Sequence, residues 1–102
     1  MEYADLPKDY IKAEGPDGLR SALDNLLINQ ASPSQYILYQ LGNQQSLIKV
    51  DLSTKPFQFW YYDLLGRPAT RIVKETLARF AWEKGGEQEW YLQELEKGVH
   101  HD

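Results

Sequence analysis

The spacing of hydrophobic positions first becomes helical after Asp17. Apolar residues then recur every three or four positions until about Gln30, at Leu19, Ala22, Leu23, Leu26 and Leu27. Asp17 is a favourable N-cap, and Pro33 cannot continue a helix because it lacks a backbone N–H. We therefore predict one helix with a single apolar stripe between these two residues.

The segment before this helix has no clear period. Residues 1–15 are interrupted by Pro7 and Gly15, and Pro16 and Gly18 follow directly. We predict an irregular N-terminal arm, with at most one short turn or strand around Tyr10-Ile11.

Two runs of alternating polarity, 35–41 and 45–52, flank the pair Gly42-Asn43. Such a pair is typical of a tight β-hairpin turn, because it tolerates positive φ angles. If Leu41 and Gln44 flank the turn, the hairpin register follows. One face then pairs Ile37 with Ile48, Tyr39 with Ser46 and Gln35 with Val50, and the other pairs Leu38 with Leu47 and Tyr36 with Lys49.

A third alternating run, 57–63, follows Pro56. An antiparallel pairing with the second run places Phe57, Phe59 and Tyr61 beside Leu52, Val50 and Ile48. One face of the sheet is then strongly apolar. The second face carries two rows, Tyr36, Lys49, Trp60 and Leu38, Leu47, Tyr62.

Helical spacing returns after Pro68, which suits the first turn of a helix. The predicted buried stripe comprises Ala69, Ile72, Val73, Thr76, Leu77, Phe80 and Ala81, and Gly85-Gly86 ends the helix. A last helical segment is predicted over about 88–97, with Tyr91, Leu92 and Leu95 on one face. We predict a flexible polar tail over residues 98–102.

These elements predict a single α+β domain over residues 1–102. Its sheet is a three-stranded antiparallel meander with helices packed on one face, in the order α-β-β-β-α-α. Between about residues 18 and 84 this arrangement resembles the double-stranded-RNA-binding domain in topology. That family typically begins its second helix with a lysine-rich run, whereas this chain has Arg67, Arg71 and Lys74 there, so the resemblance implies no particular RNA-contacting residue.

Composition narrows the classes of function. The chain has 102 residues, a formal charge of −4 and no cysteine, which excludes disulfides, thiolate nucleophiles and iron–sulfur clusters. The negative charge disfavours nucleic acid as a partner, although a local basic patch leaves it possible. The acidic N-terminus lacks a secretory signal, and no apolar run is long enough for a membrane span, so we expect a cytoplasmic protein without a membrane partner.

Large aromatic residues exceed the needs of one small core. The chain has three Trp, seven Tyr and three Phe, and all three Trp fall outside the predicted core stripes. Trp and Tyr dominate binding hot spots, so we predict a surface that binds a protein partner or a second copy of the chain. Its residues are Tyr36, Lys49, Trp60, Tyr62, Trp82 and Trp90. Alternatively, the last helix folds over this face and the aromatics form a second cluster within one chain.

Three cations near the start of the second main helix suggest a different function. Arg67, Arg71 and Lys74 lie at the positive end of the helix dipole, where free backbone N–H groups bind anions. An anion or nucleic-acid backbone is therefore an alternative ligand. The simpler interpretation is that these side chains extend into water and that Arg71 and Arg79 pair with Glu75.

The sequence contains no strong pattern of catalytic or metal-binding residues. The only histidines are His100 and His101, which together with Asp102 occupy the chain end, where no fixed geometry holds a metal. Without cysteine or an internal histidine, the commonest nucleophiles and general bases are missing. We predict no catalytic residues, no metal site and no cofactor, and we favour a protein that is not an enzyme. The alternative is a small hydrolase or lyase whose site is assembled from residues far apart in the sequence.

Overall fold

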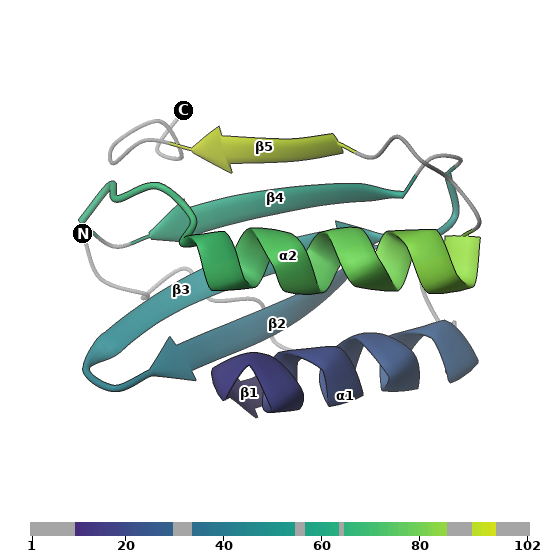
Figure 1. The fold of residues 1–102 in the computed structure, drawn as a ribbon, viewed down its shortest axis with the longest axis horizontal. Coiled ribbons are helices and arrows are strands. Elements are labelled where there is room, and N and C mark those ends of the chain that lie inside the picture. Colours follow the sequence, from purple (N-terminus) through teal and green to yellow (C-terminus); the bar gives the residue numbers. More distant parts are fainter. Residues whose placement is uncertain (1–9, 30–33, 55–56, 64, 86–90, 96–102) are drawn as a thin grey trace.

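The computed structural model describes residues 10–29, 34–54, 57–63, 65–85 and 91–95. Two helices lie on one face of a five-stranded sheet (Figure 1). In chain order the elements are β1 (Ile11–Glu14), α1 (Gly15–Ile28), β2 (Ser34–Leu41), β3 (Gln44–Asp51), β4 (Gln58–Asp63), α2 (Arg71–Phe80), the π-helical turn η2 (Ala81–Gly85) and β5 (Tyr91–Leu95). No helix in these residues is long and apolar enough to cross a membrane.

The α+β class is confirmed, and the central meander has the predicted register. Strands β2, β3 and β4 are antiparallel neighbours, with Ile37 opposite Ile48 and Val50 opposite Phe59. The hairpin turns at Gly42, whose φ of 61° is a backbone conformation that glycine adopts without strain. The second face carries the predicted row in which Lys49 lies between Tyr36 and Trp60.

The purely antiparallel sheet and the order α-β-β-β-α-α are wrong. Strand β1 pairs in parallel with β2, and β5 pairs in parallel with β4, so the sheet is mixed and runs in the order β1-β2-β3-β4-β5. Half of the final segment predicted as a helix over about 88–97 is the strand β5, and the other half lies outside the described residues. Backbone pairing explains both differences, because each added strand satisfies N–H and C=O groups that would otherwise line an open sheet edge.

Both helices begin at positions other than those predicted. Helix α1 starts at Gly15, directly after β1, so that Pro16 and Asp17 lie inside its first turn and Asp17 is not the N-cap. Helix α2 starts at Arg71, where the Thr70 hydroxyl accepts a hydrogen bond from the Val73 N–H at 3.4 Å. Thr70 is a stronger N-cap than the residues near Pro68, because its side-chain oxygen accepts a hydrogen bond from a backbone N–H that has no partner within the helix.

The core lies between the two helices and one face of the sheet. It includes Leu19, Leu23, Ile37, Ile48, Val50, Phe59, Val73, Leu77 and Phe80, all fully buried. Ile72 is a correction to the predicted stripe, because 45% of it is exposed. The hydroxyl of Tyr39 is buried without a hydrogen-bond partner in the described residues, and burial, with a smaller effect from Tyr61, raises the pKa of Tyr39.

Candidate functional site

The second face of the sheet carries the aromatic residues that the alternation predicts. Phe59 and Tyr61 point into the core, so the intervening Trp60 and Tyr62 point to the opposite side of β4. Trp60 and Tyr62 remain partly exposed, whereas Phe59 is fully buried. The period of two along a strand thus produces two faces with different roles.

A shallow hollow of about 230 Å³ lies on this second face. We call it the aromatic hollow; it is lined by Tyr36, Leu47, Lys49, Trp60 and Tyr62. The Lys49 ammonium lies 4.8 Å from the centre of the Trp60 ring, a cation–π contact worth about 0.5–1 kcal/mol at an exposed site. The hollow is therefore mostly apolar, with one positive charge held over an indole.

Four of the six residues predicted for partner binding line this hollow, and Leu47 is an addition. Trp82 does not line it: Trp82 belongs to η2, which continues α2, and 54% of it is exposed. Trp90 lies outside the described residues. The structure therefore brings together the residues from β2, β3 and β4 that share one face by register.

Two of the three cations predicted as an anion site have carboxylate neighbours. Arg67 forms a two-pronged ion pair with Asp63, at 3.0 Å from Nε to Oδ2 and 3.2 Å from Nη2 to Oδ1. Arg71 pairs with Glu75 at 2.9 Å, and both side chains are exposed, so this bond contributes little stability. Lys74 is exposed on the first turn of α2. The guanidinium of Arg67 is thus engaged within the fold.

Asp63 is the most strongly organised polar group of the described residues, and sequence reasoning missed its role. It ends β4 on the core side and is only 4% exposed. Its Oδ2 also accepts hydrogen bonds from the backbone N–H groups of Leu65, at 2.9 Å, and Arg67, at 3.2 Å. The only available signal was the spacing of four residues between Asp63 and Arg67 across the Gly66 turn.

The pKa of Asp63 reflects opposing influences. Burial alone would raise it, but the hydrogen bonds from Arg67 and from the two backbone N–H groups, together with the Arg67 charge, hold the pKa below its usual value. The carboxylate therefore stays ionised and fixes the connection between β4 and α2.

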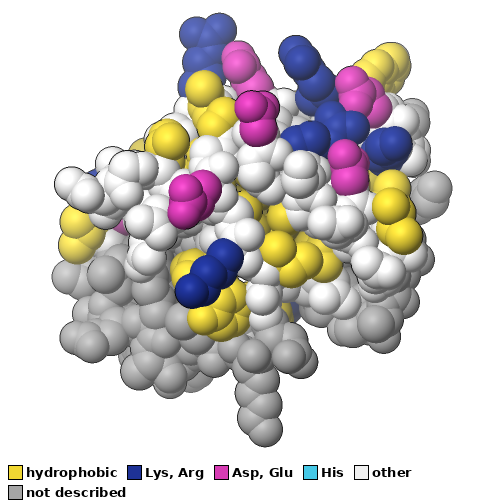
Figure 2. Space-filling model, turned by 90° about the horizontal axis from the view of Figure 1, so that it is seen from below, with side chains coloured by type: hydrophobic (Ala, Val, Ile, Leu, Met, Phe, Trp, Pro, Cys, Tyr) yellow, Lys and Arg dark blue, Asp and Glu magenta, His cyan; other side chains and the backbone are white. Residues whose placement is uncertain are grey.

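No family model and no curated protein sequence matches this chain. Among the described residues, no group of three or more His, Asp or Glu side chains is arranged to hold a metal ion. The functional argument therefore depends on the surface that the structure describes. Figure 2 shows acidic and basic side chains intermingled along the upper edge of that view, and below them a hydrophobic patch crossed by one basic side chain.

Proposed function

We propose that this protein is a small, non-enzymatic interaction module whose aromatic hollow packs against a protein surface, in the simplest case the same face of a second copy. The supporting observation is the hollow itself, in which Tyr36, Trp60 and Tyr62 share one sheet face without entering the core. Tyr and Trp bury large areas with few rotatable bonds, which is why they are enriched in interfaces. The cytoplasm stays the expected compartment.

A second copy is the occupant we favour. Two sheets pack face to face at a separation of about 10 Å, with side chains of both inner faces interdigitating. Most homo-oligomers are two-fold dimers in which one patch contacts itself. A chain of 102 residues has a small core, so burying a second apolar sheet face adds stability that the monomer lacks.

The test is the mass in solution of the wild-type protein and of two variants on this face. Trp60→Ala removes the largest ring in the hollow, and Lys49→Glu replaces the cation with an anion without shortening the chain greatly. We expect sedimentation equilibrium to show a dimer that both variants weaken by about tenfold or more, because a hot-spot residue contributes about 2 kcal/mol.

Leu65→Ala is the matched control. Leu65 is a large exposed apolar residue, 61% exposed, that does not line the hollow, so its loss should leave the mass unchanged. Circular dichroism checks that each variant is folded. If Leu65→Ala weakens association as much as Trp60→Ala, the hollow is not the interface.

The anion site at Arg67, Arg71 and Lys74 remains a second proposal with less support. Its favourable features are the exposed cations and the first turn of α2, which contains no acidic residue. Against it, Asp63 already neutralises Arg67, and Glu75 lies beside Arg71. If Arg71→Glu leaves the binding of RNA or phosphate unchanged at low ionic strength, this alternative fails.

A further inference from the structure

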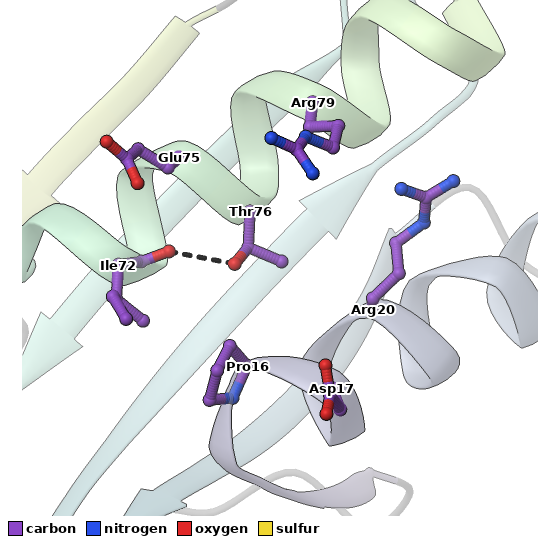
Figure 3. Close-up of a pocket in the computed structure, with 7 residues that line it drawn as sticks. All are labelled: Pro16, Asp17, Arg20, Ile72, Glu75, Thr76 and Arg79. Atoms are coloured by element: carbon purple, nitrogen blue, oxygen red, sulfur yellow. Dashed lines mark hydrogen bonds between the residues drawn. The ribbon is translucent and has the colours of Figure 1, made fainter.

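A groove of about 260 Å³ lies between the N-terminal part of α1 and the side of α2 from Ile72 to Arg79, on a different part of the molecule from the aromatic hollow. Figure 3 shows its lining, which α1 and α2 both supply. We call it the interhelical groove; it is lined by Pro16, Asp17, Arg20, Ile72, Glu75, Thr76 and Arg79. Neither the aromatic hollow nor the proposed anion site at Arg67, Arg71 and Lys74 includes this groove.

Two guanidinium groups from different helices face this groove. Arg20 of α1 bonds Asp24 through Nε, at 3.1 Å, and Glu83 through Nη2, at 2.6 Å, which leaves its Nη1 free of these ion pairs. Arg79 of α2 has no ion pair or hydrogen bond within the described residues, contrary to its predicted pairing with Glu75. Arg79 is exposed, and an exposed arginine beside a second arginine suits a carboxylate or phosphate as a ligand.

Asp24 and Glu83 already pair with Arg20, so among the described residues Arg79 supplies the positive charge of this groove that has no carboxylate partner. Figure 3 shows Asp17 on α1 and Glu75 on α2 well apart from each other, while the guanidinium groups of Arg20 and Arg79 lie at the same end. Glu75 already accepts a hydrogen bond from Arg71. The basic end of the groove is therefore where an anionic group would gain most.

Pro16 and Ile72 supply the apolar part of the lining. Ile72 is 45% exposed although it belongs to a helix that packs on the core. The Thr76 hydroxyl donates a hydrogen bond to the Ile72 carbonyl at 2.8 Å, so its proton is not available to a ligand (Figure 3). With Pro16 these residues form a surface suited to a short aliphatic group.

We propose that the interhelical groove binds a small organic anion, with its carboxylate or phosphate between Arg20 and Arg79 and its aliphatic part on Ile72 and Pro16. The arginine fork matches both head groups, because each offers two oxygens in one plane. The volume, about 260 Å³, is just below the usual range for ligand pockets and suits a molecule of a few carbon atoms. The proposal is independent of the aromatic hollow.

The test is a titration followed by NMR of the arginine Nε–Hε groups in the full chain. The probes are butyrate, inorganic phosphate and butyramide, which has the shape of butyrate without its charge. We expect the Arg79 signal to shift and saturate with butyrate or phosphate at millimolar concentration, and not with butyramide. Butyrate alone would identify a carboxylate ligand, and phosphate alone a phosphate ligand.

Two variants make the result specific. Arg79→Gln, followed through the Nε–Hε signal of Arg20, should weaken the binding of the effective anion by about tenfold, because it removes a charge-assisted hydrogen bond. Lys84→Gln removes the same charge from an exposed residue that does not line the groove, and it should leave the affinity unchanged. The proposal is overturned if no probe shifts Arg79, if butyramide shifts it as butyrate does, or if both variants weaken binding equally.

Discussion

At the scale of single residues, the buried carboxylate of Asp63 is the polar group on which the fold most depends. Its oxygens accept four hydrogen bonds from Arg67 and Leu65, two of them from backbone N–H groups. A buried carboxylate without partners would be costly, whereas one with charged and backbone donors is stabilised. Asp63 therefore fixes the route of the chain from the sheet to α2.

Asp63→Asn tests this role. The amide keeps the size of the side chain but loses the charge, so we expect a loss of about 2 kcal/mol in the free energy of unfolding at neutral pH. Urea denaturation measures the loss. Asp51→Asn is the control, because the Asp51 side chain bonds only the exposed Ser53 among the described residues, and this change should cost far less.

The stability of wild type and that of Asp63→Asn should also depend differently on pH. The folded pKa of Asp63 is lowered, so as the pH falls the unfolded chain takes up a proton first, near the ordinary Asp value of about 3.9. The contribution of Asp63 is therefore complete above that value and is lost progressively below it. The stability gap between wild type and Asp63→Asn should narrow in acid, and a gap that stays constant from neutral pH to pH 3 contradicts this role.

Sequence reasoning identified which residues of the meander share a face and that Arg71 pairs with Glu75, but it missed the pair of Asp63 with Arg67. The period of two placed Trp60 off the core and Phe59 inside it, and both positions are confirmed. The prediction that Ile72 is buried was wrong, because the apolar stripe of the helix is wider than the part of the helix surface that the sheet covers. The pairing of Asp63 with Arg67, and the lack of an ion pair for Arg79 within the described residues, depend on side-chain directions that spacing alone does not determine.

At the scale of elements, the edges of the sheet were the least predictable part. The segment with Tyr91, Leu92 and Leu95 has helical spacing, yet it forms β5 beside β4. A short apolar run of this kind fits a helix and a strand equally well. Pairing with the free edge of β4 decides between them, and that edge exists only once the meander has formed.

Arg20 links α1 to η2, the element that follows α2. Its guanidinium bonds Glu83 and Asp24 and lies 5.6 Å from the centre of the Phe80 ring. The partners are partly exposed, so we expect Arg20→Gln to cost only about 1 kcal/mol, measured as a lower urea midpoint. Arg20→Lys, which keeps the charge but not the planar fork, should recover part of the loss. An unchanged midpoint in Arg20→Gln would mean that the helices are held by the core alone.

At the scale of the whole molecule, the sheet divides the protein into two unequal sides. One side is a closed core under α1 and α2 (Figure 1), and the other carries the aromatic hollow. The hairpin at Gly42 determines this division, because a slip of one residue would exchange the two faces. The proposed interface and the proposed groove thus lie on opposite sides of the sheet, and variants in one should not affect the other.

The accessibility of Trp60 tests the central proposal most directly. A variant with Trp82→Phe and Trp90→Phe keeps Trp60 as its single indole, and acrylamide quenching reports how open that ring is. We predict that the quencher reaches Trp60 in dilute protein and that protection grows with concentration as two copies associate. A Trp60 shielded to the same degree at every concentration, in a chain that sediments as a monomer, would contradict the account.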